Sequence, residues 1–456
     1  MGGLAMKSYI SWSKNLKLKK YSEQIIVMEV YEDLEKRRCH SFSLNPTGAE
    51  IIRSINGTRT YDEVIALLSE KYNENYDRVD ALVTEFIMNL SKLHGIDVIY
   101  SRVPKYISYE VVEEKSMYPK VVTLELTDRC NIKCLHCYGD YGKVGNHDMS
   151  LEDIKNILFQ FEELGVHTIE LTGGEITIHP DLKEILLYTL SLKYDQISFL
   201  SNGIALTEEI MDIIIENKSR FVVQIDIHSL DDDYLHWFTK APRTLSRIQR
   251  NIMKLAENHV KMRTATVITR RNIQEIENIA DWVHSLNIEH FGISPVLSLG
   301  RAMGADNDLY LTSEDMILLE EKLNIINNKY ANFISIIDSN RSDSKNCGAL
   351  TSHCVISSRG DVKICTMDNL KYFDSSIGNV LEKDIKTLYH ENRDYILAFF
   401  NMPSPQLDSS ECRSCSNIYY CSACVLRGLI KAKEMGDNCT WFKNRIPALI
   451  KEKLLI

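Results

Sequence analysis

The chain has 456 residues, 44% of them hydrophobic and 25% charged, so it is long enough for two to four globular domains with buried cores. Its formal net charge of −10 argues against nucleic acid as a main partner, because phosphate binding needs a basic face. No apolar run of about eighteen residues is present, and the basic segment 1–20 lacks the apolar stretch of a signal peptide. We therefore expect a cytoplasmic protein without a membrane partner.

Residues 1–105 are predicted to form a winged-helix module. Strand patterns cover 23–31 and 39–44, and apolar residues at helical spacing cover 47–56, 61–72 and 79–95. Winged helices commonly bind DNA. Residues 21–105, however, contain ten Lys and Arg against fourteen Asp and Glu, which argues against a duplex partner.

Part of this module is similar to a known peptide-binding family. The segment LNPTGAEIIRSINGTRTYDEVIALLSEKY resembles precursor recognition elements, whose founding member is the peptide chaperone of pyrroloquinoline quinone biosynthesis. The resemblance implies that the module holds the leader of a ribosomal precursor peptide. The leader would add a strand to a sheet edge, so that backbone hydrogen bonds supply affinity and side pockets supply specificity. A structural cap without a ligand is the alternative.

After a predicted linker at 106–119, strand and helix patterns alternate through 120–335. Six strands are expected, at 120–126, 167–172, 196–201, 220–227, 261–269 and 290–297, and each of the first five is followed by a helix. This repeat favours an α/β fold whose parallel sheet curves into a partial (β/α)6 barrel of the TIM type. Ligands of such barrels bind at the carboxyl ends of the strands.

Three cysteines follow the first predicted barrel strand with the spacing C-x3-C-x2-C: Cys130, Cys134 and Cys137. In the cytoplasm, grouped cysteines serve as metal ligands more often than as disulfides. Three thiolates on a [4Fe-4S] cluster would leave one iron open, whereas a buried helical stripe is the alternative. The segment LTDRCNIKCLHCYGD resembles the cluster loop of radical S-adenosylmethionine (radical SAM) enzymes. That resemblance implies that the open iron chelates the amino and carboxylate groups of SAM.

A glycine pair and a glutamate follow the second predicted strand in ELTGGEITIHP: Gly173, Gly174 and Glu175. They match the radical SAM family's contact to the amino group of SAM. Glycines let a backbone pass close to a ligand, and a carboxylate suits an ammonium group. Proline often follows this glutamate in the family, whereas Ile176 stands here, as in some thioether-forming members.

The resemblance implies four further cofactor contacts, to the adenine, the ribose and the carboxylate of SAM. Asn202, Asp226 and Arg263 lie on later predicted strands, where the family places polar contacts to the ribose and the carboxylate. Relatives commonly have serine at the position of Asp226. His136 precedes the last cysteine of the loop, where the backbone usually contacts the adenine. A paired or solvated polar residue is the alternative for Asn202, Asp226 and Arg263.

In residues 336–456 the periodicity fades and eight cysteines occur, namely Cys347, Cys354, Cys365, Cys412, Cys415, Cys421, Cys424 and Cys439. Eight thiolates can close two four-cysteine sites, for iron–sulfur clusters or for zinc, because C-x2-C pairs also occur in zinc knuckles. The pattern resembles the SPASM extension of radical SAM enzymes. This resemblance implies two auxiliary [4Fe-4S] clusters.

The SPASM resemblance also assigns these cysteines. The first auxiliary cluster would be held by Cys347, Cys365 and Cys424, and the second by Cys412, Cys415, Cys421 and Cys439. The short step from Cys421 to Cys424 occurs in subtilosin-type maturases. We expect Cys354 to close the first auxiliary cluster; as a bystander, it would leave an iron open to a substrate thiolate. Cys39, the remaining cysteine, is expected to be a small buried hydrophobe.

The order of the three regions predicts an iron–sulfur oxidoreductase that modifies peptides. The resemblance implies a radical SAM maturase that joins a cysteine sulfur to a carbon of the same ribosomal precursor peptide. A 5′-deoxyadenosyl radical would remove the hydrogen, and an auxiliary cluster would accept the surplus electron. An electron donor such as flavodoxin or ferredoxin is expected. The alternatives are carbon–carbon or carbon–oxygen crosslinking, epimerisation, action on a small molecule or a sulfatase, and a zinc-binding winged-helix regulator without catalysis.

Overall fold

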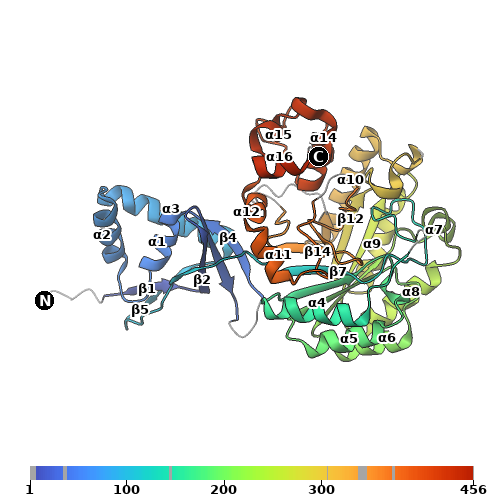
Figure 1. Ribbon diagram of the computed structural model, residues 1–456, viewed down its shortest axis with the longest axis horizontal. Helices are drawn as coiled ribbons and strands as arrows, with labels where there is room; N and C mark the ends of the chain where they lie inside the picture. The colour runs from blue at the N-terminus through green and yellow to red at the C-terminus, as the bar shows by residue number, and fades with distance from the viewer. Residues whose placement is uncertain are drawn as a thin grey trace. The chain divides into compact units, whose positions relative to one another are not determined.

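Residues 7–33, 38–142, 146–305, 307–336, 347–371 and 375–454 are described by the computed structural model of the chain. The chain divides into two compact units, Met1–Met117 and Tyr118–Ile456 (Figure 1). Within the described residues, no helix combines the length and the apolar character that a membrane crossing requires.

The first unit contains two sheets. Its strands are β1 (Tyr9–Trp12), β2 (Asn15–Ser22), β3 (Ile25–Tyr31), β4 (His40–Leu44), β5 (Val98–Ser101) and β6 (Val111–Glu113). One sheet has the order β4-β3-β2-β6, with β4 at an edge, and β1 pairs with β5 in the other. The predicted strands correspond to β3 and β4. Strand β2 was not predicted, although its buried Leu16 and Leu18 alternate with lysines.

Strand β6 corrects the interpretation of residues 106–119 as a linker. Val111–Glu113 pairs in parallel with Leu18–Lys20 of β2 and so belongs to the sheet of the first unit. A three-residue strand with one half-buried and two exposed side chains leaves little periodicity to recognise.

The three predicted helices are present as α1 (Pro46–Ser54), α2 (Tyr61–Tyr72) and α3 (Tyr76–His94). Each begins at a side-chain cap, and at α2 the Thr60 and Glu63 side chains form a reciprocal capping box. The apolar faces of the helices pack on the sheet in one core that includes Leu18, Met28, Ile52 and Val64.

The second unit is built on a nine-stranded sheet in the order β13-β12-β11-β10-β9-β8-β7-β14-β15. The six predicted parallel strands are present as β7 (Val121–Glu125), β8 (Thr168–Thr172), β9 (Gln196–Ser201), β10 (Phe221–Asp226), β11 (Lys261–Ile268) and β12 (His290–Pro295). Val122 and Leu124 are fully buried apolar residues. Thr123 and Glu125, which alternate with them along the strand, carry polar groups on the opposite face. The sheet therefore has one apolar and one polar face at β7.

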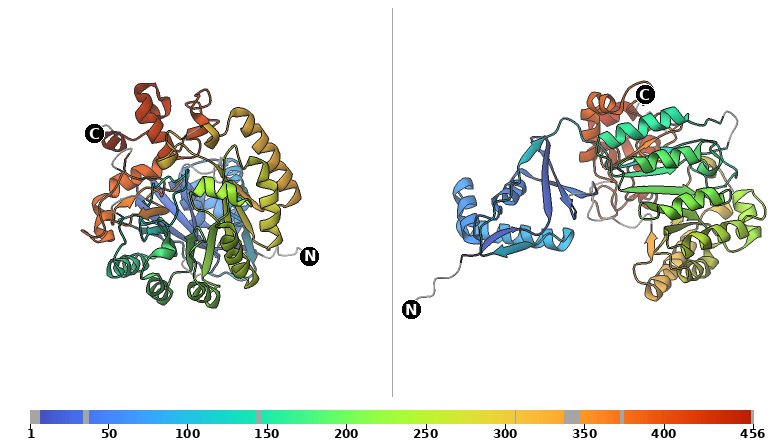
Figure 2. Two further views of the ribbon diagram at one scale, coloured as in Figure 1. Left: turned by 90° about the vertical axis from the view of Figure 1, so that its right-hand side faces the viewer. Right: turned by 90° about the horizontal axis from the view of Figure 1, so that it is seen from below.

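Helices cover the outside of this curved sheet (Figure 2). They are α4 (Leu151–Glu163), α5 (Leu182–Ser191), α6 (Glu208–Glu216), α8 (Leu245–Glu257), α9 (Ile276–Ser285) and α10 (Ser313–Lys329). Helix α7 (Asp232–Thr239) lies instead at the carboxyl end of the barrel, where the backbone N–H of Leu135 donates to the Phe238 carbonyl at 2.8 Å. Helix α7 was not predicted. It has eight residues and is capped by the side chain of Asp231.

The cysteine-rich end continues the barrel sheet. Strand β14 (His353–Ile356) pairs in parallel with β7, and β15 (Val362–Lys363) pairs antiparallel with β14. Strand β13 (Ile334–Ile336) closes the other edge, on β12. The helices α11 (Ile385–Glu391), α12 (Arg393–Asn401), α13 (Ile418–Cys421), α14 (Val425–Met435), α15 (Thr440–Arg445) and α16 (Ala448–Leu454) follow. The expected boundary between residues 335 and 336 thus divides β13, and β14 and β15 beyond it extend the barrel sheet.

Candidate active site

One cavity lies at the carboxyl ends of the barrel strands. Nine of the predicted site residues line it, namely Cys130, Cys134, His136, Cys137, Gly173, Gly174, Glu175, Asn202 and Asp226. They come from the loop after β7 and from the ends of β8, β9 and β10. The expectation that these segments meet at one end of the barrel agrees with this geometry.

The three loop thiols lie close enough to affect one another electrostatically. Burial, followed by the charges of Glu175 and Cys137, raises the pKa of Cys130 to about 11. Burial and the neighbouring cysteines raise the pKa of Cys134 well above its usual range. Thiolates at these positions therefore need a bound positive charge, which iron would supply.

The glycine pair is required by a close approach of two loops. Gly173 has a φ of 145°, and a Cβ there would lie 2.4 Å from the Thr127 carbonyl oxygen. A Cβ on Gly174 would lie 2.0 Å from the Arg129 carbonyl oxygen. The backbone N–H groups of Gly174 and Glu175 donate to these same carbonyls, at 2.8 Å each. The turn after β8 is thus fastened to the cluster loop while it lines the cavity.

Glu175 is buried and strongly hydrogen-bonded. Its Oε1 accepts from the Thr177 N–H (3.0 Å), the Thr177 hydroxyl (2.6 Å) and the Ser201 hydroxyl (2.7 Å), and its Oε2 accepts from the Asn202 N–H (2.7 Å). Burial raises the pKa of Glu175, although these donors partly oppose it. Each carboxylate oxygen has about two lone-pair positions, and Oε2 has a single donor, so Oε2 retains one position for an ammonium group.

Two further residues shape the far wall of the cavity. His136 stacks on Phe238 of α7, with ring centroids 4.6 Å apart and planes 7° apart. Burial lowers its pKa well below the usual value, and His228 and Arg301 lower it further, so the ring is neutral. Asp226 accepts from Gln224 at 2.9 Å, and burial raises its pKa to about 6.

Arg263 does not belong to the residues that line this cavity. It lies on β11 opposite Gln224 of β10, and its charge acts on Asp226 and on Glu170 of β8. Its Nε is buried without a hydrogen-bond partner among the described residues. Arg263 therefore acts electrostatically on a cavity-lining residue, Asp226, without lining the cavity itself.

Arg301, which the sequence analysis missed, joins the turn after β12 to the cluster loop. Its guanidinium donates to the carbonyls of Cys134 (2.8 Å) and Tyr141 (2.5 Å), and its backbone N–H donates to the carbonyl of Cys137 (2.8 Å). Gly300 has a φ of 56°, and a Cβ there would lie 2.4 Å from the Cys137 carbonyl oxygen. The Gly-Arg pair in the loop that follows the last barrel strand is the sequence signal that could have identified this contact.

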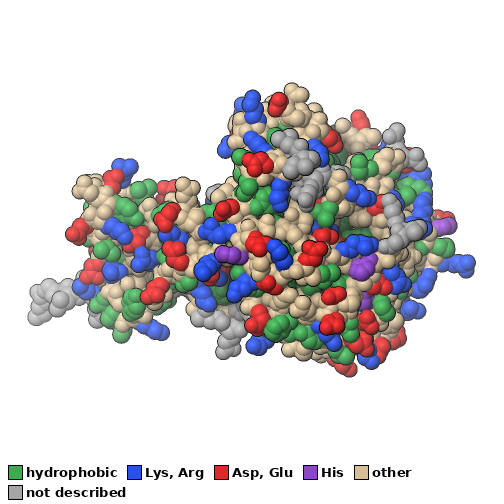
Figure 3. All heavy atoms as spheres, in the orientation of Figure 1, with side chains coloured by type: hydrophobic (Ala, Val, Ile, Leu, Met, Phe, Trp, Pro, Cys, Tyr) green, Lys and Arg blue, Asp and Glu red, His purple; other side chains and the backbone are tan. Residues whose placement is uncertain are grey.

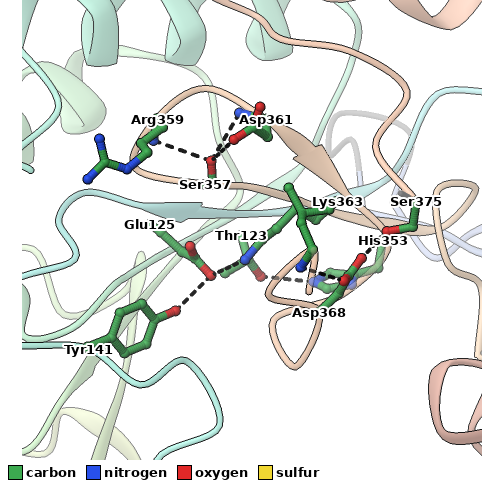
Figure 4. Close-up of polar contacts among 11 residues, drawn as sticks. Thr123, Glu125, Tyr141, His353, Ser357, Arg359, Asp361, Lys363, Asp368 and Ser375 are labelled. Carbon is green, nitrogen blue, oxygen red and sulfur yellow. Dashed lines mark hydrogen bonds and ion pairs between the residues drawn. The ribbon is translucent and has the colours of Figure 1, made fainter. Parts of the chain in front are cut away.

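A buried ion pair connects the barrel to the cysteine-rich region. Lys363 Nζ of β15 lies 2.8 Å from Glu125 Oε1 of β7, with side-chain exposures of 6% and 4%. The Tyr141 hydroxyl donates to the same Glu125 oxygen at 2.9 Å. Figure 4 shows the three side chains directed toward one another. Tyr141 also lines the cavity, so this pair links the cavity wall to the strand that precedes Cys365.

The C-terminal cysteines fall into two electrostatic groups. Burial raises the pKa of Cys365 well above its usual range, and Cys424 and Cys347 raise it further. Burial raises the pKa of Cys421 to about 12, with contributions from the remaining cysteines, Cys415, Cys439 and Cys412. The grouping agrees with the assignment inferred from the SPASM resemblance for seven of the eight thiols.

Cys354 is not brought to either group. It lies on β14, fully buried, where its thiol is hydrogen-bonded with Tyr389, and burial raises its pKa to about 12. Cys39 is half-buried just before β4. In the described part of the chain, no three His, Cys, Asp or Glu side chains have the geometry of a site for one metal ion. A four-iron cluster binds each thiolate through a different iron, so its ligands need not meet at one point.

Three family models match successive parts of the chain. Residues 33–96 match coenzyme PQQ synthesis protein D (PqqD), residues 124–283 match the radical SAM superfamily, and residues 347–416 match an iron–sulfur cluster-binding domain (SPASM). The radical SAM match contains the cluster loop, the Gly-Gly-Glu turn, Asn202, Asp226 and Arg263. Cys421, Cys424 and Cys439 lie beyond the SPASM match.

Curated relatives include two proteins of Bacillus subtilis strain 168. The antilisterial bacteriocin subtilosin biosynthesis protein AlbA is 26% identical over 412 residues, covering 88% of each chain. The sporulation killing factor maturation protein SkfB is 25% identical over 274 residues, covering 59% of this chain and 64% of SkfB.

Solved structures share the fold. Streptococcus suis SuiB bound to S-adenosylmethionine aligns with a TM-score of 0.58 at 16% identity, over 93% of this chain and 96% of SuiB. A second SuiB structure contains the precursor peptide SuiA and aligns equally well, at 0.58. Native anSMEcpe with bound AdoMet aligns with a TM-score of 0.55 over 74% of this chain and 99% of its own.

Proposed function

The chain is a radical SAM enzyme with a PqqD-like domain and a SPASM domain, and we propose that it installs thioether bridges in a ribosomal precursor peptide. These domains imply SAM and [4Fe-4S] clusters as cofactors. The bridge would join a cysteine sulfur to a carbon of the same peptide, with the loss of two hydrogen atoms. The similarity to AlbA, a subtilosin biosynthesis protein, supports this choice of reaction.

One observation carries the proposal: the same chain has three thiols that line the cavity and two separate groups of neighbouring thiols in its C-terminal region. Cys130, Cys134 and Cys137 would hold the SAM-binding cluster, which supplies a 5′-deoxyadenosyl radical when SAM is bound. Thiol chemistry fits this assignment. Burial raises the pKa of Cys130 and Cys134 and so disfavours their thiolates, and a cationic iron centre would offset this cost of ionisation.

The other cavity residues position the cofactor. Glu175 would accept a hydrogen bond from the SAM amino group through Oε2, while its remaining acceptors are held by the ends of β8 and β9. His136 is kept in one orientation by its stacking on Phe238, so the backbone beside Cys137 is fixed where the adenine would lie. Asn202 and Asp226 would contact the ribose or the carboxylate, and Arg263 would act on Asp226.

The C-terminal groups would hold two auxiliary clusters. Cys347, Cys365 and Cys424 would bind the first, which is connected to the cavity wall through the Lys363–Glu125 pair, and the other four thiols would bind the second. Cys354 hydrogen-bonds with Tyr389 instead, which favours its role as a bystander and a first cluster with one open iron.

The partners follow from the first unit and from the redox chemistry. Strand β4, an edge of its sheet, offers the backbone groups that an added leader strand would bind. We also propose a flavodoxin or ferredoxin as electron donor and a cytoplasmic location. Acidic and basic side chains are interspersed on the face shown in Figure 3, so no broad basic surface for nucleic acid is visible there.

The test is mass spectrometry of a short, cysteine-bearing peptide taken from a reading frame next to this gene as candidate precursor. We expect reduced enzyme with SAM to lower the peptide mass by two hydrogens per bridge and to remove one alkylatable cysteine per bridge. Tandem fragmentation must locate the link at sulfur, because carbon–carbon and carbon–oxygen links remove the same mass. An unchanged mass with full SAM cleavage would contradict thioether formation and indicate epimerisation.

Two controls separate the other classes of function. Anaerobically purified protein should be brown and contain iron, whereas colourless protein with zinc would refute the enzyme. A labelled leader peptide should bind the full chain, and substitution of Phe42 in β4 by Asp should weaken binding. Failure of the leader to bind would favour a small-molecule or sulfatase substrate.

A further inference from the structure

One surface of the barrel carries cations without acidic partners, although the chain as a whole has a net charge of −10. Residues 234–256, which cover most of α7 and α8, include five Lys and Arg and no Asp or Glu. One of the five, Lys254, pairs with Glu208 of α6. The other four are exposed: Lys240, Arg243, Arg247 and Arg250. In the part of the chain that the structure describes, their side chains take part in no ion pair or hydrogen bond.

The cluster loop lies against this surface. The backbone N–H of Lys133 donates to the Thr239 carbonyl at 2.9 Å, and that of Leu135 donates to the Phe238 carbonyl at 2.8 Å. Lys133 is exposed, and its side chain likewise forms no ion pair with the described residues. It directly precedes Cys134 in the chain. An unpaired cation therefore lies one residue from a thiol assigned to the SAM-binding cluster.

The cations cover the outer side of one wall of the cavity. Thr239 at the end of α7 and Ile248 of α8 line the cavity, whereas the adjacent residues Lys240 and Arg247 are exposed. Neighbouring residues on these two helices thus face the cavity and the solvent in turn. A molecule seated on the exposed side chains is separated from the cavity only by this wall.

Nearby acidic side chains are engaged in other contacts. Asp232 at the start of α7 accepts the backbone N–H of Leu245 at 3.0 Å, which fixes the connection between α7 and α8. At the start of α6, Glu209 pairs with Lys183 of α5 at 2.5 Å. The exposed cations of α7 and α8 are therefore available to a partner of opposite charge from outside the chain.

These cations fit the partner that the proposed chemistry needs. The SAM-binding cluster must gain one electron before SAM is cleaved, and electron transfer between proteins slows steeply as the distance grows. A donor must therefore approach the chain close to the cluster loop. Flavodoxins are acidic electron carriers, and complexes of this kind bury small interfaces and are transient. Complementary charges raise the association rate of such complexes more than their affinity.

We propose that this surface docks a flavodoxin, an acidic one-electron carrier, through four cations: Lys133, Lys240, Arg243 and Arg247. Reduced flavodoxin loses one electron and the SAM-binding cluster gains it, while no bond is formed or broken. The proposal rests on the proposed function for the presence of that cluster and for its need of an electron donor.

The test compares a protein donor with a chemical donor, using the full chain with its clusters. One variant combines Lys240→Glu, Arg243→Glu and Arg247→Glu, and a second carries Gln at the same three positions, which removes the charges without reversing them. Lys261→Glu is the matched control, because Lys261 is exposed at the amino end of β11, away from the cluster loop. Two quantities are measured without precursor peptide: 5′-deoxyadenosine formation with reduced flavodoxin or with dithionite, and the Kd of oxidised flavodoxin at low salt.

We expect charge reversal to slow flavodoxin-driven SAM cleavage by about tenfold or more, the lower end of what electrostatic steering contributes to association rates. The Kd of flavodoxin should rise in the same variant, and the Gln variant should show a smaller loss. Added salt should slow the wild type toward the variants, because it screens exposed charges. Dithionite-driven cleavage should equal that of the wild type in every variant, and Lys261→Glu should match the wild type with both donors.

Three results would overturn the proposal. An equal loss with dithionite would show that the residues serve the fold or the SAM site. Unchanged flavodoxin-driven cleavage in both triple variants, or a flavodoxin that does not bind the wild type, would remove the docking surface. Weaker binding of the precursor peptide with unchanged flavodoxin kinetics would assign the surface to the substrate. Since both readouts omit the precursor, a wild type that cleaves SAM but makes no thioether would refute the proposed function alone.

Discussion

Arg301 should control the chemistry of the cavity although it lies on a different loop from the cysteines. Its guanidinium binds the carbonyls of Cys134 and Tyr141, and its Nε lies 3.3 Å from Asp140 Oδ1. Arg301→Met removes all of these contacts. Hydrogen bonds to a charged group contribute about 1.5–3 kcal/mol each, so the two carbonyl contacts alone hold the loop with about 3–6 kcal/mol.

The loss should appear in catalysis, because the Cys134 carbonyl loses its guanidinium donor and Cys134 would move. A displacement of about 1 Å in a positioned group lowers rates by about 10²-fold. We expect Arg301→Met to slow reductive SAM cleavage by roughly that factor, and Arg301→Lys to be intermediate because an ammonium lacks the planar fork of the guanidinium. The assay is the formation of 5′-deoxyadenosine, with iron content measured on the same sample.

Arg78→Met is the matched control. Arg78 pairs with Glu74 on the surface of the first unit, where an exposed ion pair contributes about 0.2–1 kcal/mol. It should therefore leave SAM cleavage unchanged. If Arg301→Met retains wild-type iron content and wild-type cleavage, the inferred clamp on the cluster loop is wrong.

Three further predictions concern buried groups. Cys354→Ala should leave the iron content unchanged and cost about 0.5–1.5 kcal/mol through the lost contact with Tyr389. Lys363→Met should destabilise the protein by about 3–5 kcal/mol because it leaves the Glu125 carboxylate buried alone, and adding Glu125→Gln should recover most of that loss in urea unfolding. Asp226 has a raised folded pKa of about 6, so in SAM-free protein its ionisation destabilises the fold as the pH rises from about 4 to 7, by up to about 3 kcal/mol. Asp226→Asn should remove that pH dependence.

Each of these has an outcome that contradicts it. Loss of about four irons per chain from Cys354→Ala would make that residue a cluster ligand after all. A single Lys363 variant that costs less than about 1 kcal/mol would show that water reaches the ion pair. Parallel stability–pH curves for the wild type and Asp226→Asn would mean that Asp226 titrates normally in the folded protein.

Much of the fold could be predicted because periodicity is strong where burial is complete. The barrel strands alternate or run apolar between amphipathic helices, and all six were located to within a few residues. Strand β6 was missed because two of its three side chains are exposed, and β2 because its alternation of Leu16 and Leu18 with lysines is short. The pairing of β14 with β7 is a tertiary contact across more than 200 residues, and neither strand carries a local signal for it.

At the site, residue types were predictable but their partners were not. The cysteine spacing and the Gly-Gly-Glu turn identified the cavity residues. The reason for the glycines, a Cβ collision with the Thr127 and Arg129 carbonyls, depends on how two loops meet. Arg263 was expected beside the cofactor from its strand alone, and this stays a prediction: its charge acts on Asp226, which lines the cavity, although Arg263 itself is not among the lining residues.

The C-x2-C pair at Cys421 and Cys424 shows why spacing alone left zinc open. In a zinc knuckle the two cysteines of such a pair bind the same ion. Here Ala423 adopts a left-handed conformation, and the two thiols have different electrostatic partners: Cys412 acts on Cys421, whereas Cys424 acts on Cys365. A residue pair that bridges two sites suits an electron relay, since it joins them through one short segment of the chain. The same motif therefore supports iron–sulfur clusters over zinc once its backbone conformation is known.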